Sequence, residues 1–151
     1  MGIHDTDPNT PNKEFAPEGW HVPSDVEWTT LANHLIANGY NYDDTTEVNK
    51  IAKAMASTTG WLSSTILGYP GNDQGTNNSS GFNAFPDGAR GYAGLFDDDH
   101  WNFGALFWSS TSVDEAIHDI GVNRYLLSSF SDFIKGTTFK HYGLSVRFVR
   151  D

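Results

Sequence analysis

Helical patterns occupy the first part of this 151-residue chain and strand patterns its last third. Residues 24–27 (SDVE) form a capping box, in which Ser24 caps a helix and Glu27 reaches back. The apolar spacing after it predicts a helix that ends near Asn38-Gly39. A second box at 44–47 (DTTE) predicts another helix, ending at 58–60. Helices first and antiparallel strands later indicate the α+β class.

Three later segments read as strands. Residues 106–111 (LFWSST) are a compact β-prone run, and residues 117–127 suggest a second strand whose alternation is poor. Residues 144–150 alternate, with Leu144, Val146 and Phe148 on one face. A shorter extended piece, Trp20 to Pro23, precedes the first helix. We therefore expect a small antiparallel sheet.

The length and mass, 151 residues and 16.7 kDa, fit one domain. Residues 1–14 are polar and read as a flexible lead-in or linker, which leaves 15–151 as the single domain. Residues 68–104 are dense in Gly, Asn, Asp and Ser. An irregular segment of that length inside a compact domain is more often functional than idle.

Charge and cysteine content exclude several classes of function. Nine basic and 19 acidic residues give a net charge of −10, which repels nucleic acid and anionic lipid surfaces. No apolar stretch approaches the roughly 20 residues of a membrane span, so we expect no membrane insertion. With no cysteine, the chain has no disulfide, thiolate nucleophile or iron–sulfur cluster.

Sequence motifs for catalysis are lacking, and one metal candidate stands out. Asp97, Asp98 and Asp99 offer hard oxygen ligands suited to Ca²⁺, although a solvated acidic loop explains them equally simply. The six histidines form no short zinc spacing, and Ser109-Ser110 lacks the elbow of a serine nucleophile. We predict that the chain is not an enzyme and has no cofactor other than this calcium candidate.

Four segments in order resemble the Fibrobacter succinogenes major paralogous domain: residues 16–28, 81–90, 107–111 and 143–149. The resemblance implies a C-type-lectin-like fold of the formylglycine-generating-enzyme-like branch. In that fold the terminal strands meet, and two helices accompany a small antiparallel sheet and long irregular loops. It also implies an extracellular or cell-surface module of a bacterium, as part of a larger surface protein.

The resemblance assigns roles to individual residues. Trp20, Trp28, Trp108 and Arg147 look structural, with Arg147 holding the core or a loop. The segment after the Trp-Ser motif is the binding face of related variable domains of diversity-generating retroelements. Carried over, the ligand-binding residues are Ser112, Asp114, His118, Asn123, Tyr125, Ser128, Ser129, Asp132 and Phe133, with Tyr92 and Trp101 in a nearby loop.

Two positions depart from the family pattern. Ala16 and Phe148 stand where relatives commonly have cysteine, and both are lost together, as expected if those cysteines pair. Losing such a bridge forgoes roughly 4 kcal/mol in the chain-entropy model, so we expect packing of Phe148 to compensate. The formylglycine-generating oxidase also needs active-site cysteines, which excludes that activity here.

The sequence thus favours a non-catalytic recognition or adhesion module that binds a glycan or a protein through its loops. One alternative is a structural, terminal domain of a surface or fibre assembly that binds only its neighbours. Another is a hydrolase in which Asp97 to Asp99 act with Asp114 or Glu115 as a carboxylate pair.

Overall fold

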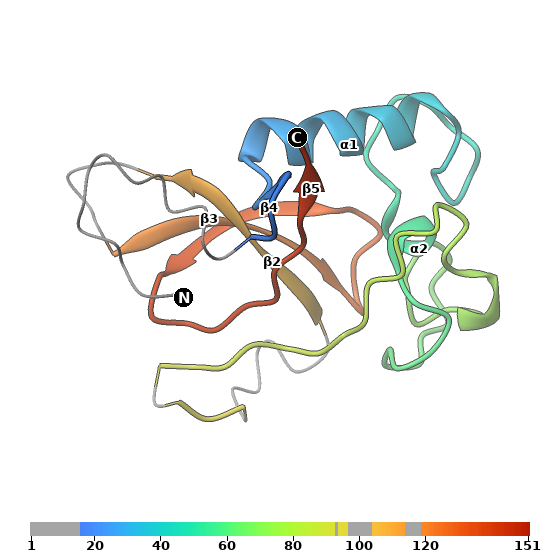
Figure 1. Cartoon of the computed structure of the whole chain (residues 1–151). Helices are drawn as coiled ribbons and strands as arrows, with labels where there is room; N and C mark the ends of the chain where they lie inside the picture. Colours follow the sequence, from blue (N-terminus) through green and yellow to red (C-terminus); the bar gives the residue numbers. More distant parts are fainter. Residues whose placement is uncertain (1–15, 93, 97–103, 114–118) are drawn as a thin grey trace.

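The computed structural model describes residues 16–92, 94–96, 104–113 and 119–151 (Figure 1). In chain order the elements are β1 (Trp20–His21), α1 (Asp25–Ala37), α2 (Ala52–Met55), the 3₁₀ turn η2 (Gln74–Thr76), β2 (Gly104–Ser112), β3 (Ile120–Leu127), β4 (Ile134–Phe139) and β5 (Val149–Arg150). The predicted lead-in, Asp97 to Asp99, Trp101, Asp114, Glu115 and His118 lie outside the described residues.

Two antiparallel sheets organise the molecule. The larger has the order β2-β3-β4, and the smaller pairs β1 with β5, so that Trp20 lies opposite Arg150. The predicted α+β class, with two helices and small antiparallel sheets, is confirmed. Figure 1 shows α1 along one side of the larger sheet, and the loops of residues 57–92 below and beside that sheet. None of the described helices has the length and apolarity that a membrane crossing requires.

Helix α1 begins as its sequence predicts. The Ser24 hydroxyl accepts from the Glu27 N–H at 3.3 Å, and the Glu27 carboxylate accepts from the Ser24 N–H at 2.8 Å. The helix closes at Asn38, whose N–H donates to the His34 carbonyl at 3.1 Å. Its buried residues, Trp28, Ala32 and Leu35, form one stripe that faces the core.

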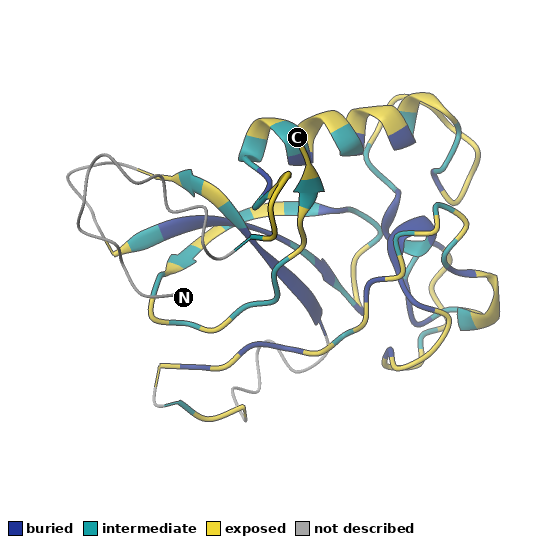
Figure 2. Cartoon of the chain, viewed as in Figure 1, coloured by how far each residue is buried: buried dark blue, intermediate teal, exposed yellow. Residues whose placement is uncertain are grey.

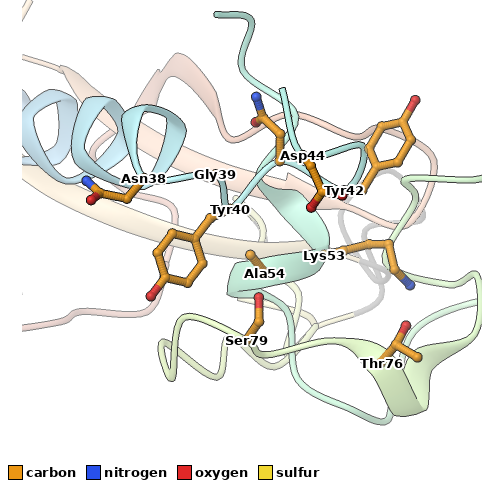
Figure 3. Close-up of a pocket in the computed structure, with 10 residues that line it drawn as sticks. Asn38, Gly39, Tyr40, Tyr42, Asp44, Lys53, Ala54, Thr76 and Ser79 are labelled. Carbon is orange, nitrogen blue, oxygen red and sulfur yellow. The ribbon is translucent and has the colours of Figure 1, made fainter. Parts of the chain in front are cut away.

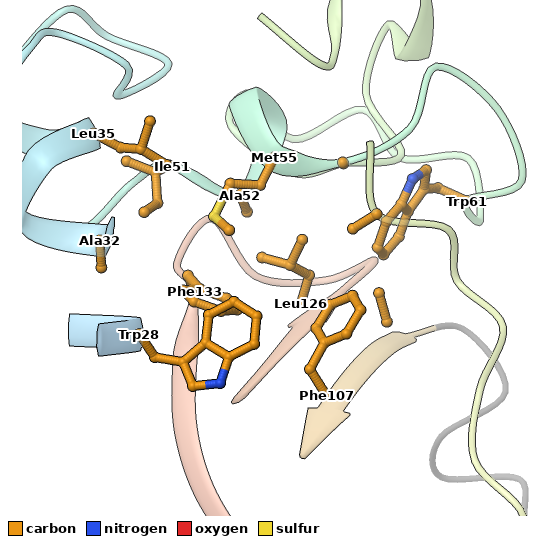
Figure 4. Packing of buried hydrophobic residues seen from close by; sticks show 13 residues of the cluster. Trp28, Ala32, Leu35, Ile51, Ala52, Met55, Trp61, Phe107, Leu126 and Phe133 are labelled. Carbon is orange, nitrogen blue, oxygen red and sulfur yellow. The ribbon is translucent and has the colours of Figure 1, made fainter. Parts of the chain in front are cut away.

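The core lies between α1, α2 and the larger sheet (Figure 4). Four aromatic rings meet there: Trp28 lies 5.8 Å from Phe107 and 5.6 Å from Phe133, and Phe82 packs edge-on to both Trp28 and Phe107. Such aromatic pairs add about 0.5–1.5 kcal/mol each to the burial of their surface. This cluster fixes how α1 sits on the sheet.

The second helix is shorter than predicted. It covers only Ala52–Met55, and the capping box expected at 44–47 does not form. Asp44 instead adopts φ +59°, and the buried Asn41 amide donates to the carbonyls of Thr45 and Val48, both at 2.7 Å. These side-chain bonds to the backbone hold residues 41–50 in a loop, because they replace the bonds that a helix would have made.

The strand prediction is right for β2 and β3 and wrong in two other places. Within the predicted strand 144–150 only β5 (Val149–Arg150) is regular, while Ser145 makes an isolated bridge to Phe107. Strand β4, which was not predicted from the sequence, forms an outer edge of the sheet. Figure 2 shows the consequence: β3 is the buried central strand, and β4 alternates between intermediate and exposed residues.

Candidate functional site

The predicted binding face is divided between the two ends of the sheet. Ser112 ends β2 and is exposed, whereas Ser129 and Asp132 lie in the turn between β3 and β4. β3 has eight residues, and at roughly 3.3 Å per residue its two ends lie more than about 20 Å apart. These residues therefore do not form one small site.

Three of the predicted ligand-binding residues are buried, so that part of the prediction is wrong. Phe133 is 1% exposed and belongs to the core cluster, and Asn123 on β3 is also 1% exposed. Ser128 is 7% exposed, and its hydroxyl accepts from the Leu62 N–H at 3.3 Å. Tyr125 is half-buried, and burial raises the pKa of its hydroxyl.

Four rings meet at the end of the sheet where β2 ends and β3 begins. His141 stacks on Phe139 with 5.1 Å between centroids and on Tyr142 at 5.3 Å. Tyr92 meets His141 edge-on at 4.7 Å. Tyr92 is 77% exposed and Phe139 is 49% exposed, so this cluster lies outside the core. We call Tyr92, Phe139, His141 and Tyr142 the sheet-end surface.

The backbone explains why Tyr92 reaches His141. Arg90 and Gly143 exchange two backbone hydrogen bonds of 2.8 Å, which place the 90–96 turn beside the residues that follow β4. Within the turn the Gly91 N–H donates to the Leu95 carbonyl, and Arg90 Nε donates to the Gly94 carbonyl. Gly94 has φ +77°, a conformation that other residues rarely adopt.

A polar rim joins this surface to the ends of β2 and β3. The Lys140 N–H donates to the Asp119 carbonyl at 2.6 Å. Lys140 Nζ donates to the Ser112 hydroxyl at 3.4 Å. Two predicted residues, Tyr92 and Ser112, thus lie at the same end of the sheet.

The predicted structural residues occupy varied environments. Trp28 and Trp108 are buried, and Trp28 Nε1 donates to the Trp108 carbonyl at 3.4 Å. Trp20 is 43% exposed on β1. The Arg147 guanidinium lies over the Phe82 ring, 4.8 Å from its centroid, and donates to the carbonyls of Phe82 and Asn83. Arg147 therefore fastens the 82–83 loop to the last segment of the chain.

The residues that the structure describes do not form a candidate metal centre. No three His, Asp or Glu side chains of this part of the chain come together as a metal site would require. The calcium candidates Asp97, Asp98 and Asp99 lie outside it, as do Asp114 and Glu115 of the hydrolase hypothesis. The calcium site therefore stays a prediction.

Most of the sheet-end surface was not predicted from the sequence. Phe139, His141 and Tyr142 lie between the Trp-Ser motif and the last predicted strand, but they were not among the residues that the resemblance carried over. Their signal in the sequence is FKHY at 139–142, which contains three ring-bearing residues. Because successive side chains of a strand point to opposite faces, a buried strand could not place all three rings on one face.

A family model described as the Fibrobacter succinogenes major domain matches residues 5–150 of this chain. A search of curated proteins and a search of solved structures each found no match. The match covers nearly the whole chain, and it includes the sheet-end surface and both sheets. The C-type-lectin-like fold that the resemblance implied has no solved neighbour here to support it.

Proposed function

The chain belongs to the Fibrobacter succinogenes major domain family, and we propose that this member is a non-catalytic recognition module that binds a protein ligand through its sheet-end surface. The observation that carries the proposal is the exposure of the ring cluster: large aromatic side chains are usually buried, yet Tyr92 is 77% exposed. Exposed aromatic clusters with a polar rim are typical of interaction sites.

The surroundings of the rings favour a protein over a glycan. The chain segments beside Tyr92 and Ser112 carry further exposed apolar residues: Leu95 is 60%, Phe96 67% and Val113 45% exposed. A sugar stacks on one or two ring faces and needs many hydrogen-bonding groups around them. A protein partner can cover an aromatic and aliphatic surface of this kind, with Tyr and Phe as anchors.

Charge favours a basic partner. The chain carries a net charge of −10, so long-range attraction raises the association rate with a positively charged surface. Binding to such a partner becomes weaker as salt screens these charges. We place the module on a bacterial cell surface, as the resemblance implies, and labelling of intact cells with an antibody to this domain tests that location.

An array of purified bacterial and host surface proteins tests the function. We expect the domain to bind at least one of them and the Tyr92→Ser/Phe139→Ser variant to bind it at least about tenfold more weakly. Phe130→Ser is the matched control, because Phe130 is 46% exposed in the turn at the opposite end of the sheet.

A glycan array, run in parallel, tests the alternative that the ligand is a glycan. If the domain binds only glycans, and the sheet-end variant abolishes that binding, the ligand is a glycan and not a protein. If both arrays are silent and the domain self-associates in sedimentation, it is a structural domain of an assembly. If the control variant weakens binding as much as the sheet-end variant does, the binding site is not on this surface.

A diversified receptor is the finer form of this proposal. Variation would have to spare Asn123, Arg124 and Leu126, since these β3 residues are buried, and would fall on exposed positions near the sheet-end surface such as Ser112. The encoding DNA tests it. A neighbouring reverse transcriptase and a near-copy of the codons for 108–150 would support it, and the lack of both would contradict it.

A further inference from the structure

A pocket of about 410 Å³ opens where the C-terminal end of α1 faces α2 (Figure 3). The residues that bear on its chemistry come from the end of α1, from α2 and from two loops: Asn38, Tyr40, Asp44, Lys53, Thr76 and Ser79. Tyr40 and Ser79 lie on one side of Ala54, and Lys53 and Thr76 on the other (Figure 3). The volume is within the roughly 300–1,000 Å³ of small-molecule sites. We call this the helix-end pocket.

Several polar groups of the helix-end pocket are available to a ligand. The Tyr40 hydroxyl, the Asp44 carboxylate and the Ser79 hydroxyl make no hydrogen bond to any residue that the structure describes. The neighbouring Asn41 amide, in contrast, is fully used by the 41–50 loop. The pocket thus offers a carboxylate that only accepts and hydroxyls that both donate and accept.

Backbone conformation is unusual around the same pocket. Four described non-glycine residues have a left-handed φ. Three of them lie in the loops before and after α2 that line the pocket: Asp44 at 59°, Asp73 at 42° and Asn78 at 66°. Asp44 lines the pocket, Asn78 precedes Ser79, and the Asp73 carbonyl accepts from Thr76 at 2.8 Å. Uncommon backbone conformations concentrate at ligand sites, where the surrounding structure imposes them.

The charges of the helix-end pocket oppose each other. Lys53 Nζ already donates to the carbonyls of Asn72 and Asp73, and burial lowers the pKa of this lysine. Asp44, another lining residue of the pocket, supplies the opposite charge. An anionic ligand would meet Asp44 and a cationic one would meet Lys53, so a neutral ligand is favoured over either.

We propose that the helix-end pocket binds a neutral saccharide unit, a mono- or disaccharide, at a site separate from the sheet-end surface. Sugar hydroxyls can donate to the Asp44 carboxylate and exchange hydrogen bonds with Tyr40 and Ser79. The Tyr40 ring provides an apolar wall for the C–H face of the sugar. A ligand rich in hydroxyl groups can use the Tyr40, Asp44 and Ser79 groups together.

NMR titration of the whole ¹⁵N-labelled chain tests this site. The probes are glucose, galactose, mannose and N-acetylglucosamine with their disaccharides, and glucosamine and glucuronic acid serve as charged counterparts of glucose. We expect at least one neutral sugar to shift the amide signals of Gly39, Asp44 and Ser79. Its charged counterpart should bind at least about tenfold more weakly.

Two variants locate the binding. Asp44→Asn keeps a residue type that tolerates left-handed φ and removes the charge, and Ser79→Ala removes one hydroxyl. Each should weaken the best sugar, Asp44→Asn by about tenfold. Asp87→Asn and Ser63→Ala are matched controls, because both residues are exposed and lie outside the pocket.

Four results would overturn the proposal: no neutral sugar shifts any signal, a charged counterpart binds as tightly, the shifts fall at residues 139–142, or the controls weaken binding as much as the pocket variants. The spectrum of each variant without sugar shows whether it has kept the fold. The sheet-end proposal concerns other residues and a protein ligand, so its protein array can fail without affecting this result.

Discussion

His21 connects three parts of the chain through its two ring nitrogens. Nδ1 lies 2.6 Å from an Asp151 carboxylate oxygen, and Nε2 lies 2.7 Å from a Glu27 carboxylate oxygen. Thus β1, the first turn of α1 and the residue after β5 meet at one imidazole. Phe148, which was expected to compensate for the missing bridge, is 36% exposed and packs only in part. Strand pairing and this histidine link the two terminal strands.

The histidine makes stability dependent on pH. Hydrogen bonds to Asp151 and Glu27 raise the pKa of His21 above its ordinary 6.5. Its stabilising contribution is therefore fully present below pH 6.5 and is lost as the pH rises through the higher folded-state pKa. We expect the difference in unfolding free energy between the wild type and His21→Gln to shrink between pH 6 and about pH 8.5. Urea unfolding at both pH values checks this.

His34→Gln is the control, because His34 lies on the exposed side of α1. NMR titration gives a second reading, in which His21 should titrate above pH 6.5 in the folded chain. A difference that does not change with pH, or a His21 pKa at or below 6.5, would contradict the assigned role.

The Arg147 side chain stabilises the last segment of the chain through stacking and hydrogen bonds. Its guanidinium lies 4.8 Å from the Phe82 ring centroid and 5.7 Å from that of Phe107, and it donates to two carbonyls. We expect Arg147→Ala to lower the free energy of unfolding by about 1–2 kcal/mol. Arg147→Lys should recover less than half of this loss, because an ammonium cannot stack and bridge two carbonyls in the same way.

Urea unfolding measures both variants, with Arg150→Ala as the control for loss of an exposed charge on β5. Full recovery by lysine would show that only the positive charge matters.

Helix α1 is fastened to the sheet by charge as well as by its aromatic stripe. Arg124 Nη2 on β3 donates to the Asp25 carboxylate at 2.5 Å and to the Thr29 hydroxyl at 2.7 Å. Lys135 on β4 donates to the other Asp25 oxygen at 2.7 Å. Burial alone would raise the pKa of Asp25, but the hydrogen bonds from Lys135 and Arg124 outweigh it and lower that pKa.

Removing Asp25 leaves the Arg124 side chain, only 8% exposed, without its carboxylate. We therefore expect Asp25→Ala to lower the free energy of unfolding by about 2–3 kcal/mol at pH 7, as measured in urea. The loss should shrink as the pH falls through the lowered Asp25 pKa, since the wild-type carboxylate is then protonated. Asp87→Ala, at an exposed site, is the control, and an equal effect there would refute the network.

Elements with local signals were predictable, and elements set by distant contacts were not. Capping residues and an apolar stripe specify α1 within the helix itself, so its start and end follow from the sequence. The 44–47 box fails because Asn41, outside it, supplies competing bonds. Strand β4 (IKGTTF) has a glycine at its centre and weak apolar alternation, and only its pairing with β3 makes it a strand.

Gly136 shows what β4 requires. A Cβ at this position would lie 2.7 Å from the Tyr125 ring and 2.8 Å from Asn123 Oδ1. We expect Gly136→Ala to lower the free energy of unfolding by about 1–3 kcal/mol, because Tyr125 and the buried Asn123 must move. Thermal and urea unfolding measure this loss. Gly75→Ala is the matched control, since a Cβ there meets nothing within 4 Å, and a similar cost at both glycines would contradict the packing explanation.

At the scale of the whole molecule, the two proposed sites lie at opposite ends. Figure 1 places α2 and the end of α1 at one end and the β4 terminus at the other. Of the residues predicted to bind a ligand, Tyr92 belongs to the sheet-end surface and Ser112 lies at the same end of the sheet, whereas Asn123, Ser128 and Phe133 are buried. The sequence could not predict the helix-end pocket, because its walls come from four segments that no local pattern connects.

Because the two proposed sites are far apart, we expect each to bind its ligand independently of the other. The core between the sites is a single packed cluster, and no described side chain belongs to both sites. Energetic effects of changes that are far apart and share no partner usually add. We therefore expect Tyr92→Ser/Phe139→Ser to leave sugar affinity within about twofold of the wild type, and Asp44→Asn to leave affinity for the protein ligand equally unchanged.

Calorimetric titration of each ligand in the presence and absence of the other measures the coupling directly. Equal affinities in both conditions would mean that the module holds a protein partner and a sugar at the same time, each by its own end. A change of more than about fivefold would require a coupling free energy near 1 kcal/mol, and by reciprocity both ligands would show it. Such a change would place a two-state element between the sites, within the single packed core described above.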